Sequence, residues 1–61
     1  MKKLYMFSVV IFDSDKYVTD ADVVSTSIKR AKEIAVTRIQ ARYPEWTVSA
    51  KAAYKKYLVV A

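Results

Sequence analysis

The sequence predicts an α+β fold, a small two-layer β-β-α-β domain in which a single helix covers one face of a three-stranded sheet. Three observations predict this class. An apolar run near the N-terminus is rich in β-branched and aromatic residues, a segment with helical spacing follows, and alternation of apolar and polar residues returns near the C-terminus. At 61 residues the chain is expected to form one domain, residues 1–61, with room for one helix.

The first two elements are predicted to form a hairpin. The run LYMFSVVIF is apolar except for Ser8 and is too short for a good helix, so residues 3–12 are predicted to form a strand. The segment Asp13-Ser14-Asp15-Lys16 favours a chain reversal, because Asp and Ser side chains hydrogen-bond to nearby backbone. Residues 17–24 then form the second predicted strand.

One helix is predicted over residues 28–42. Ser27 is the expected N-cap, because a serine hydroxyl accepts a hydrogen bond from a free N–H group of the first turn. Pro44 stops the helix, because the residue before a proline avoids helical geometry. Apolar residues at helical spacing form the expected buried stripe, and Ile34 lies outside it. The stripe comprises Ile28, Ala31, Ala35 and Ile39, with Val36 and Tyr43 alongside.

The third predicted strand spans residues 46–60, and a helix over residues 49–57 is the alternative for this segment. Alternation places one set of residues on a common face, namely Trp46, Val48, Ala50, Ala52 and Tyr54. A right-handed crossover through the helix places this strand beside the first, parallel to the second. The expected sheet order is therefore 2-1-3, with the most apolar strand in the centre.

The central strand has one apolar face more than a single helix can cover. The face expected under the helix consists of Tyr5, Phe7, Val9 and Ile11. The face expected to point away consists of Leu4, Met6, Ser8, Val10 and Phe12, flanked by Val18 and Val24. An apolar patch on a small protein usually marks an interface. We therefore expect Leu4, Met6, Val10 and Phe12 to bind a partner, either a second copy in a homodimer or a different protein.

Basic residues form the second candidate site in a chain of formal net charge +5. Lys29 and Arg30 fall in the first helical turn, where the helix dipole disfavours cations and free N–H groups can bind an anion. An anion- or nucleic-acid-binding site is therefore predicted at Lys29, Arg30, Lys51, Lys55 and Lys56. A solvated basic face without a ligand is the alternative.

Composition argues against most kinds of catalytic site. The chain has no Cys, His or Gly, so it lacks thiolate ligands, imidazole bases and phosphate-binding glycine loops. The acids of residues 13–22 lack the glycine and the distal glutamate of a calcium loop. We therefore expect no enzymatic activity, no metal and no cofactor. The apolar run is too short to span a bilayer and no convincing cleavage site follows it, so a cytoplasmic protein without membrane contact is expected.

The central part of the chain combines a hairpin, a serine cap, a helix with Ala31 and Ala35 four residues apart, a Tyr43-Pro44 stop and a strand. This order resembles a common architecture of small phage and mobile-element proteins, although Lys29 and Arg30 stand in a first turn that is usually acidic there. The resemblance implies a protein that clamps onto a host enzyme, a toxin or a defence component.

Two functions are predicted from these features. The first is a small non-enzymatic binding protein, phage- or mobile-element-encoded, that sequesters or inhibits a host protein by protein–protein contact. The second is a small basic regulatory protein that binds DNA or RNA through the basic helix face and the segment with Lys51, Lys55 and Lys56. A purely structural dimer subunit is the third possibility.

Overall fold

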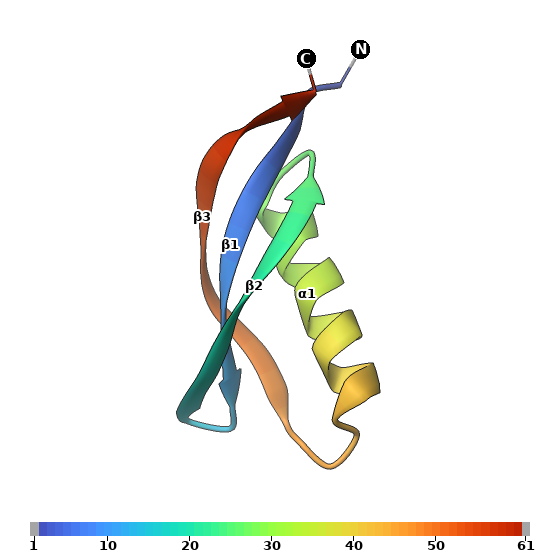
Figure 1. Cartoon of the computed structure of the whole chain (residues 1–61). Coiled ribbons are helices and arrows are strands. Elements are labelled where there is room, and N and C mark those ends of the chain that lie inside the picture. Colours follow the sequence, from blue (N-terminus) through green and yellow to red (C-terminus); the bar gives the residue numbers. More distant parts are fainter. Residues whose placement is uncertain (1, 61) are drawn as a thin grey trace.

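A computed structural model describes residues 2–60 and shows one helix packed on a three-stranded sheet (Figure 1). The elements in chain order are β1 (Leu4–Asp13), β2 (Lys16–Ser25), α1 (Ile28–Arg42) and β3 (Val48–Val60). β1 lies between β2 and β3 and pairs antiparallel with both. The predicted α+β class and the sheet order 2-1-3 are therefore confirmed.

The bounds of the elements agree with the predicted ones to within two residues. The helix has the predicted bounds, and its N-cap is Ser27, whose hydroxyl accepts a hydrogen bond from the Arg30 N–H at 3.2 Å. The strands differ from the predicted residues 3–12, 17–24 and 46–60 only at their ends. Ends are the least determined part of a strand, because pairing with a neighbour decides where each one stops.

The hairpin turn between β1 and β2 is tied to the start of β3. Ser14 has a φ of 55°, a left-handed conformation that costs a non-glycine residue about 1–2 kcal/mol. Two hydrogen bonds to Thr47 hold this turn: the Ser14 N–H donates to the Thr47 carbonyl at 2.9 Å, and the Thr47 N–H donates to Asp13 Oδ1 at 2.9 Å. These bonds offset the cost and fix the end of the sheet where the hairpin meets β3.

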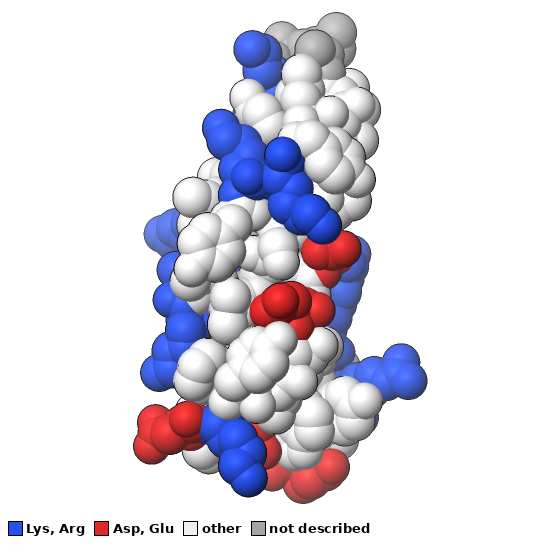
Figure 2. All heavy atoms as spheres, turned by 60° about the vertical axis from the view of Figure 1, so that its left-hand side comes forward, with Lys and Arg blue, Asp and Glu red and all other residues white. Residues whose placement is uncertain are grey.

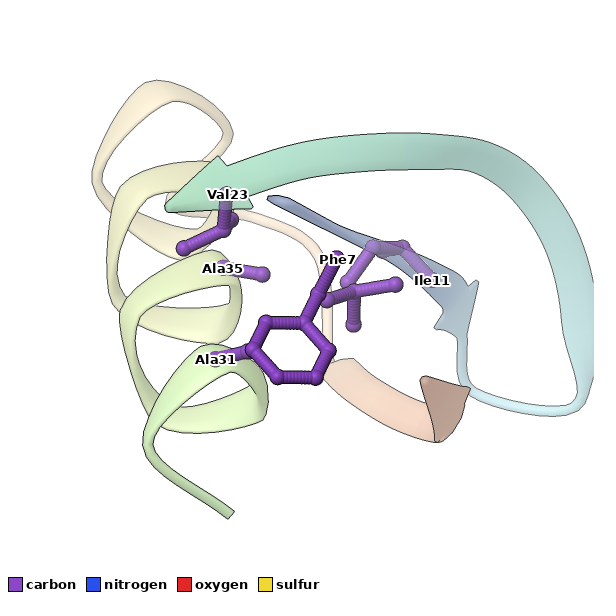
Figure 3. Close-up of a cluster of buried hydrophobic side chains, with 6 residues drawn as sticks. Phe7, Ile11, Val23, Ala31 and Ala35 are labelled. Atoms are coloured by element: carbon purple, nitrogen blue, oxygen red, sulfur yellow. The ribbon is translucent and has the colours of Figure 1, made fainter. Parts of the chain in front are cut away.

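The core lies between α1 and one face of the sheet (Figure 3). Its buried hydrophobic residues are Phe7, Val9 and Ile11 of β1, Val23 of β2, and Ala31 and Ala35 of α1. The two alanines have short side chains, so the helix approaches β1 closely and covers the large side chains of the sheet. The residues of β1 that we expected under the helix are those that lie there, with Tyr5 partly buried at the margin.

The buried face of α1 differs from the predicted stripe, because Ile28, Val36 and Tyr43 do not pack against the core, whereas Ile34 does. Ile28 is 47% exposed, and its neighbours in the first turn of the helix are exposed as well. The first buried residue of α1 is Ala31. Ile34, which we expected outside the stripe, packs against the core, as Ile39 does. The buried face of the helix therefore begins one turn later than predicted, at Ala31, and is turned toward Ile34.

β3 departs from regular alternation because it contains three register shifts. Its thirteen residues pair with the ten residues of β1, and Lys51, Lys56 and Val59 are the extra residues at the shifts. Each extra residue moves the following side chains to the other face of the sheet. Ala53 consequently packs against the core, whereas Ala52 and Tyr54 do not, which corrects the alternation predicted through Tyr54.

The side chain of Gln40 joins the end of α1 to the start of β3. Its Nε2 donates to the Trp46 carbonyl at 2.6 Å and its Oε1 accepts from the Val48 N–H at 3.1 Å. The rings of Tyr43 and Trp46 stack in the same loop, with centroids 4.0 Å apart and planes inclined by 10°. This loop sets the direction in which β3 returns to the sheet.

The exposure of Ile28 leads to the first prediction. Ile28→Glu should change the free energy of unfolding by no more than about 1 kcal/mol, because the lost contacts are offset by the helix dipole and by Lys32 four residues later. Ala35→Glu, which introduces the same charged residue at a buried position, should prevent folding. Urea denaturation followed by circular dichroism measures both. Loss of folding in Ile28→Glu would show that the first turn is buried.

The second prediction concerns the amide of Gln40. Gln40→Leu should lower the free energy of unfolding by about 1–3 kcal/mol, because the Trp46 carbonyl and the Val48 N–H lose their partner. Thr37→Leu, a control at an exposed position of the preceding turn, should lie within about 0.5 kcal/mol of the parent. Equal stabilities of the two variants in urea denaturation would contradict this role for Gln40.

Candidate protein-binding face

The face of the sheet opposite α1, here called the outer face, has no helix over it within residues 2–60 (Figure 1). Alternation along β1 places Leu4, Met6, Ser8, Val10 and Phe12 on this face, and all five are partly exposed. The structure therefore brings the predicted partner-binding residues Leu4, Met6, Val10 and Phe12 together in one line along the central strand.

Pairing with both neighbours extends this line into cross-strand rows, each with a residue of β2 on one side of β1 and a residue of β3 on the other. The rows are Val24, Met6 and Tyr57; Asp22, Ser8 and Tyr54; Asp20, Val10 and Ala52; and Tyr17, Phe12 and Ser49. Tyr54 and Tyr57 are 62% and 56% exposed. Aliphatic and aromatic side chains thus form most of a surface that is open to solvent.

A register shift in β2 changes the expected composition of this face. The partner of Ile11 is Thr19 and the partner of Phe12 is Tyr17, so Val18 is the extra residue. Val18 packs against the core, which corrects our expectation that it flanks the outer patch. Tyr17 takes its place, and its ring meets that of Phe12 edge to face at a centroid distance of 6.1 Å.

Charges of opposite sign border the outer face on its two sides. Asp20 and Asp22 lie on the β2 side, whereas Lys51 and Lys56 lie on the β3 side. Lys56 Nζ lies 3.7 Å from Asp22 Oδ2, so this side chain crosses β1, and Lys51 Nζ lies 5.6 Å from the centre of the Phe12 ring. Figure 2, which turns this side of the molecule forward, shows acidic groups set in a largely uncharged surface with basic groups near them.

The predicted anion- or nucleic-acid-binding residues are distributed over separate parts of the surface. Lys51 and Lys56 border the outer face, whereas Lys55 pairs with Phe7 and its Nζ lies 4.4 Å from the centre of the Tyr5 ring. Lys29 and Arg30 are exposed in the first turn of α1. The register shift at Lys56 places Lys55 beside Phe7 and Tyr5, whereas the side chains of Lys51 and Lys56 reach Phe12 and Asp22 on the outer face.

The helix N-terminus is less open to an anion than the sequence implied. The Arg30 N–H group already donates to Ser27, and the Arg30 guanidinium lies 3.8 Å from the carboxylate of Glu33. A shallow groove beside this turn is lined by Arg30, Glu33, Ile34, Thr37 and Arg38. Two arginines and one glutamate line the groove, so its positive charge is partly offset by Glu33.

Sequence reasoning missed several members of the outer face. Alternation along the second strand groups Asp20 and Asp22 with Val24 on one face, but these acids were not assigned to the binding site. Tyr54 and Tyr57 carried no such signal, because they are three residues apart and reach the same face only through the shift at Lys56. The same shift brings Lys56 to the outer face.

No protein-family model, curated protein or solved structure matches this chain. Within residues 2–60, no helix is both long and apolar enough to cross a membrane. The same residues contain no group of three or more His, Cys, Asp or Glu side chains placed to hold a metal ion. The site is therefore described from the geometry of the outer face.

The third prediction tests the register shift that puts Tyr17 on the outer face. Reduced hydration and the carboxylate of Asp20 raise the pKa of the Tyr17 phenol above its ordinary value. Asp20→Asn removes the negative charge and should lower the pKa of Tyr17, as followed by an NMR titration of its ring resonances. In regular alternation, residues 17 and 20 would lie on opposite faces.

Asp22→Asn is the matched control, because Asp22 lies on the same face and the same strand but two residues farther from Tyr17 than Asp20 does. It should leave the pKa of Tyr17 unchanged. An unchanged pKa in Asp20→Asn would mean that β2 alternates without a shift and that Tyr17 belongs to the other face.

Proposed function

We propose that this protein is a small non-enzymatic binding protein that acts by protein–protein contact through the outer face of its sheet. One observation carries the proposal: α1 covers one face of an apolar central strand, and the other face presents exposed aromatic and aliphatic side chains. Uncovered apolar surface of this kind is stabilised when a partner removes it from water.

The composition of the outer face favours a protein as the partner. Tyrosine, phenylalanine and methionine are enriched at protein interfaces, and this face carries Met6 and Phe12 on β1 and Tyr54 and Tyr57 on β3. Charged residues at its sides correspond to the polar rim that surrounds the apolar centre of an interface. Asp20 and Asp22 would repel the phosphates of a nucleic acid at this surface.

The proposed biological role is sequestration or inhibition of a host protein in the cytoplasm. A domain of one helix and one open sheet face can block a partner simply by covering the surface on which that partner acts. The resemblance to small phage and mobile-element proteins supports this role, because such proteins commonly act by clamping onto components of the host.

Nucleic-acid binding is the second candidate, and the charge of α1 favours it. The helix carries Lys29, Arg30, Lys32, Arg38 and Arg42 against the single acid Glu33. Most of these cations are exposed, so the solvent side of α1 is the surface that would contact phosphates. The two candidates therefore use different faces of the molecule and can be separated by substitution.

The fourth prediction compares capture of proteins from bacterial lysate by the tagged parent and two variants. Tyr54→Ser/Tyr57→Ser should lose the captured protein, because both side chains are exposed on the outer face and contribute little to the core. Arg38→Gln/Arg42→Gln should retain it, because these residues lie on α1. Nuclease treatment and added salt should have little effect.

The opposite pattern would support the nucleic-acid function. Capture would then depend on Arg38 and Arg42, disappear after nuclease treatment and fall steeply with salt, because counterion release drives phosphate binding. Circular dichroism melting curves of both variants show that each is folded before capture is compared.

A further inference from the structure

We infer that a second copy of this chain occupies the outer face, with a two-fold axis that runs along β1. This inference rests on the proposed function, because it takes the outer face to be an interface, and it names the occupant of that face in the free protein. Two sheets would then pack face to face, an arrangement in which their strands cross at about 30°.

The position of the charges along β1 carries the inference. On the β2 side, Asp22 lies level with Ser8 and Asp20 lies level with Val10. On the β3 side, Lys56 is the extra residue between the partners of Met6 and Phe7, and Lys51 is the extra residue between the partners of Val10 and Ile11. An acidic column and a basic column therefore border the same stretch of β1: Asp20 and Lys51 lie nearly level, and Lys56 lies within two residues of the height of Asp22, close enough for a lysine side chain to reach it.

A two-fold axis along β1 brings these columns together. Rotation about this axis exchanges the two sides of the sheet and keeps the height along the strand, so β2 of one copy faces β3 of the other. Asp22 then faces Lys56 of the second copy, and Asp20 faces Lys51 of the second copy. The symmetry generates each of these contacts twice.

The alternative two-fold axis, which runs across the strands, produces the opposite result. It places β2 over β2 and β3 over β3, so that acids face acids and lysines face lysines. Like charges opposed across an interface cost several kcal/mol. The charge pattern of this face therefore selects the axis along β1 and with it the register of the dimer.

The centre of the outer face fits the same symmetry. Met6, Val10 and Phe12 lie on β1, close to the axis. Each of these side chains therefore faces β1 of the second copy. These side chains are apolar and are only partly exposed in the single chain. Their contact would form the dry centre of the interface, with the charge columns at its sides.

In the single chain, the ion pair between Lys56 and Asp22 lies across the outer face. Lys56 reaches across β1 to Asp22, and the residue level with Asp22 on β1 is the small Ser8. In the dimer the same lysine turns to Asp22 of the second copy and its side chain leaves the centre of the face. Both side chains of the pair are about half exposed, so exchanging the partner involves little desolvation.

The size of the core gives an independent reason for self-association. The buried hydrophobic cluster consists of Phe7, Val9, Ile11, Val23 and the short side chains of Ala31 and Ala35. Domains of this length bury a smaller fraction of their surface than larger domains and commonly need disulfides, metals or a second subunit. This chain has no cysteine, and a second copy on the outer face would add the missing burial.

The fifth prediction is tested by sedimentation equilibrium of the parent and three variants. The parent should be a dimer at micromolar concentration. Asp20→Lys/Asp22→Lys should weaken the dimer by roughly tenfold or more, because both columns become basic. The exchange variant Asp20→Lys/Asp22→Lys/Lys51→Asp/Lys56→Asp should restore dimerisation to within about threefold of the parent, because the columns are again complementary.

Glu33→Lys/Glu45→Lys is the matched control. It raises the net charge by the same amount as Asp20→Lys/Asp22→Lys, but both glutamates are exposed on α1 or the loop after it. It should leave the dimer intact, which separates the charge columns from general repulsion. Melting curves confirm that each variant is folded, and the exchange variant has the net charge of the parent.

Two results would overturn the inference. The first is a parent that stays monomeric at roughly hundredfold higher concentration than the micromolar range. The second is an exchange variant that dissociates as readily as Asp20→Lys/Asp22→Lys, which would mean that the columns do not face each other. Neither result affects the capture experiment, so a monomer that still binds a protein through Tyr54 and Tyr57 would leave the proposed function in place.

Discussion

β1 pairs along both edges and has apolar side chains on both faces, and the other elements are arranged by the need to cover it. β2 and β3 satisfy its backbone hydrogen bonds, and α1 covers Phe7, Val9 and Ile11. The described residues, 2–60, form one helix of fifteen residues, and within them no helix covers the second face of β1. The exposed outer face is thus a direct consequence of a central strand with two apolar faces in a short chain.

The irregular pairing of β2 and β3 determines what that surface contains. In a regular β3, successive side chains would alternate between the two faces of the sheet. The actual strand contains three extra residues, Lys51, Lys56 and Val59, although it spans the same length along β1. The shift at Val18 similarly exchanges a valine for Tyr17. Because β-bulges re-aim side chains, they convert an apolar strip into a face with aromatic residues and an ordered charge pattern.

The charge pattern connects the two proposals for this face. A surface that carries acids on one side and lysines on the other is close to neutral, which suits contact with a protein better than contact with a phosphate backbone. The same arrangement is complementary to itself under one two-fold rotation. A second copy on the outer face and a foreign protein on the outer face would then compete, so the affinity of the dimer would set how readily a target is captured.

The elements of the fold were predictable from the sequence, because each has a local physical cause. Ser27 and Pro44 bound the helix through capping and proline geometry, and the run at β1 is too apolar for any position but the centre of the sheet. Leu4, Met6, Val10 and Phe12 were assigned to a common face by alternation, and the structure places them there. These assignments depend on spacing within a single segment.

Other features depended on contacts between segments, and only the tertiary structure decided them. The exposure of Ile28 and the burial of Ile34 follow from where α1 meets the sheet, which the helical period does not specify. The positions of Val18, Tyr17, Tyr54 and Lys56 follow from register shifts that are set by pairing with β1. Because one extra residue reverses the face of every side chain beyond it, sequence alternation determined the outer face of β1, while tertiary pairing determined the residues that surround it.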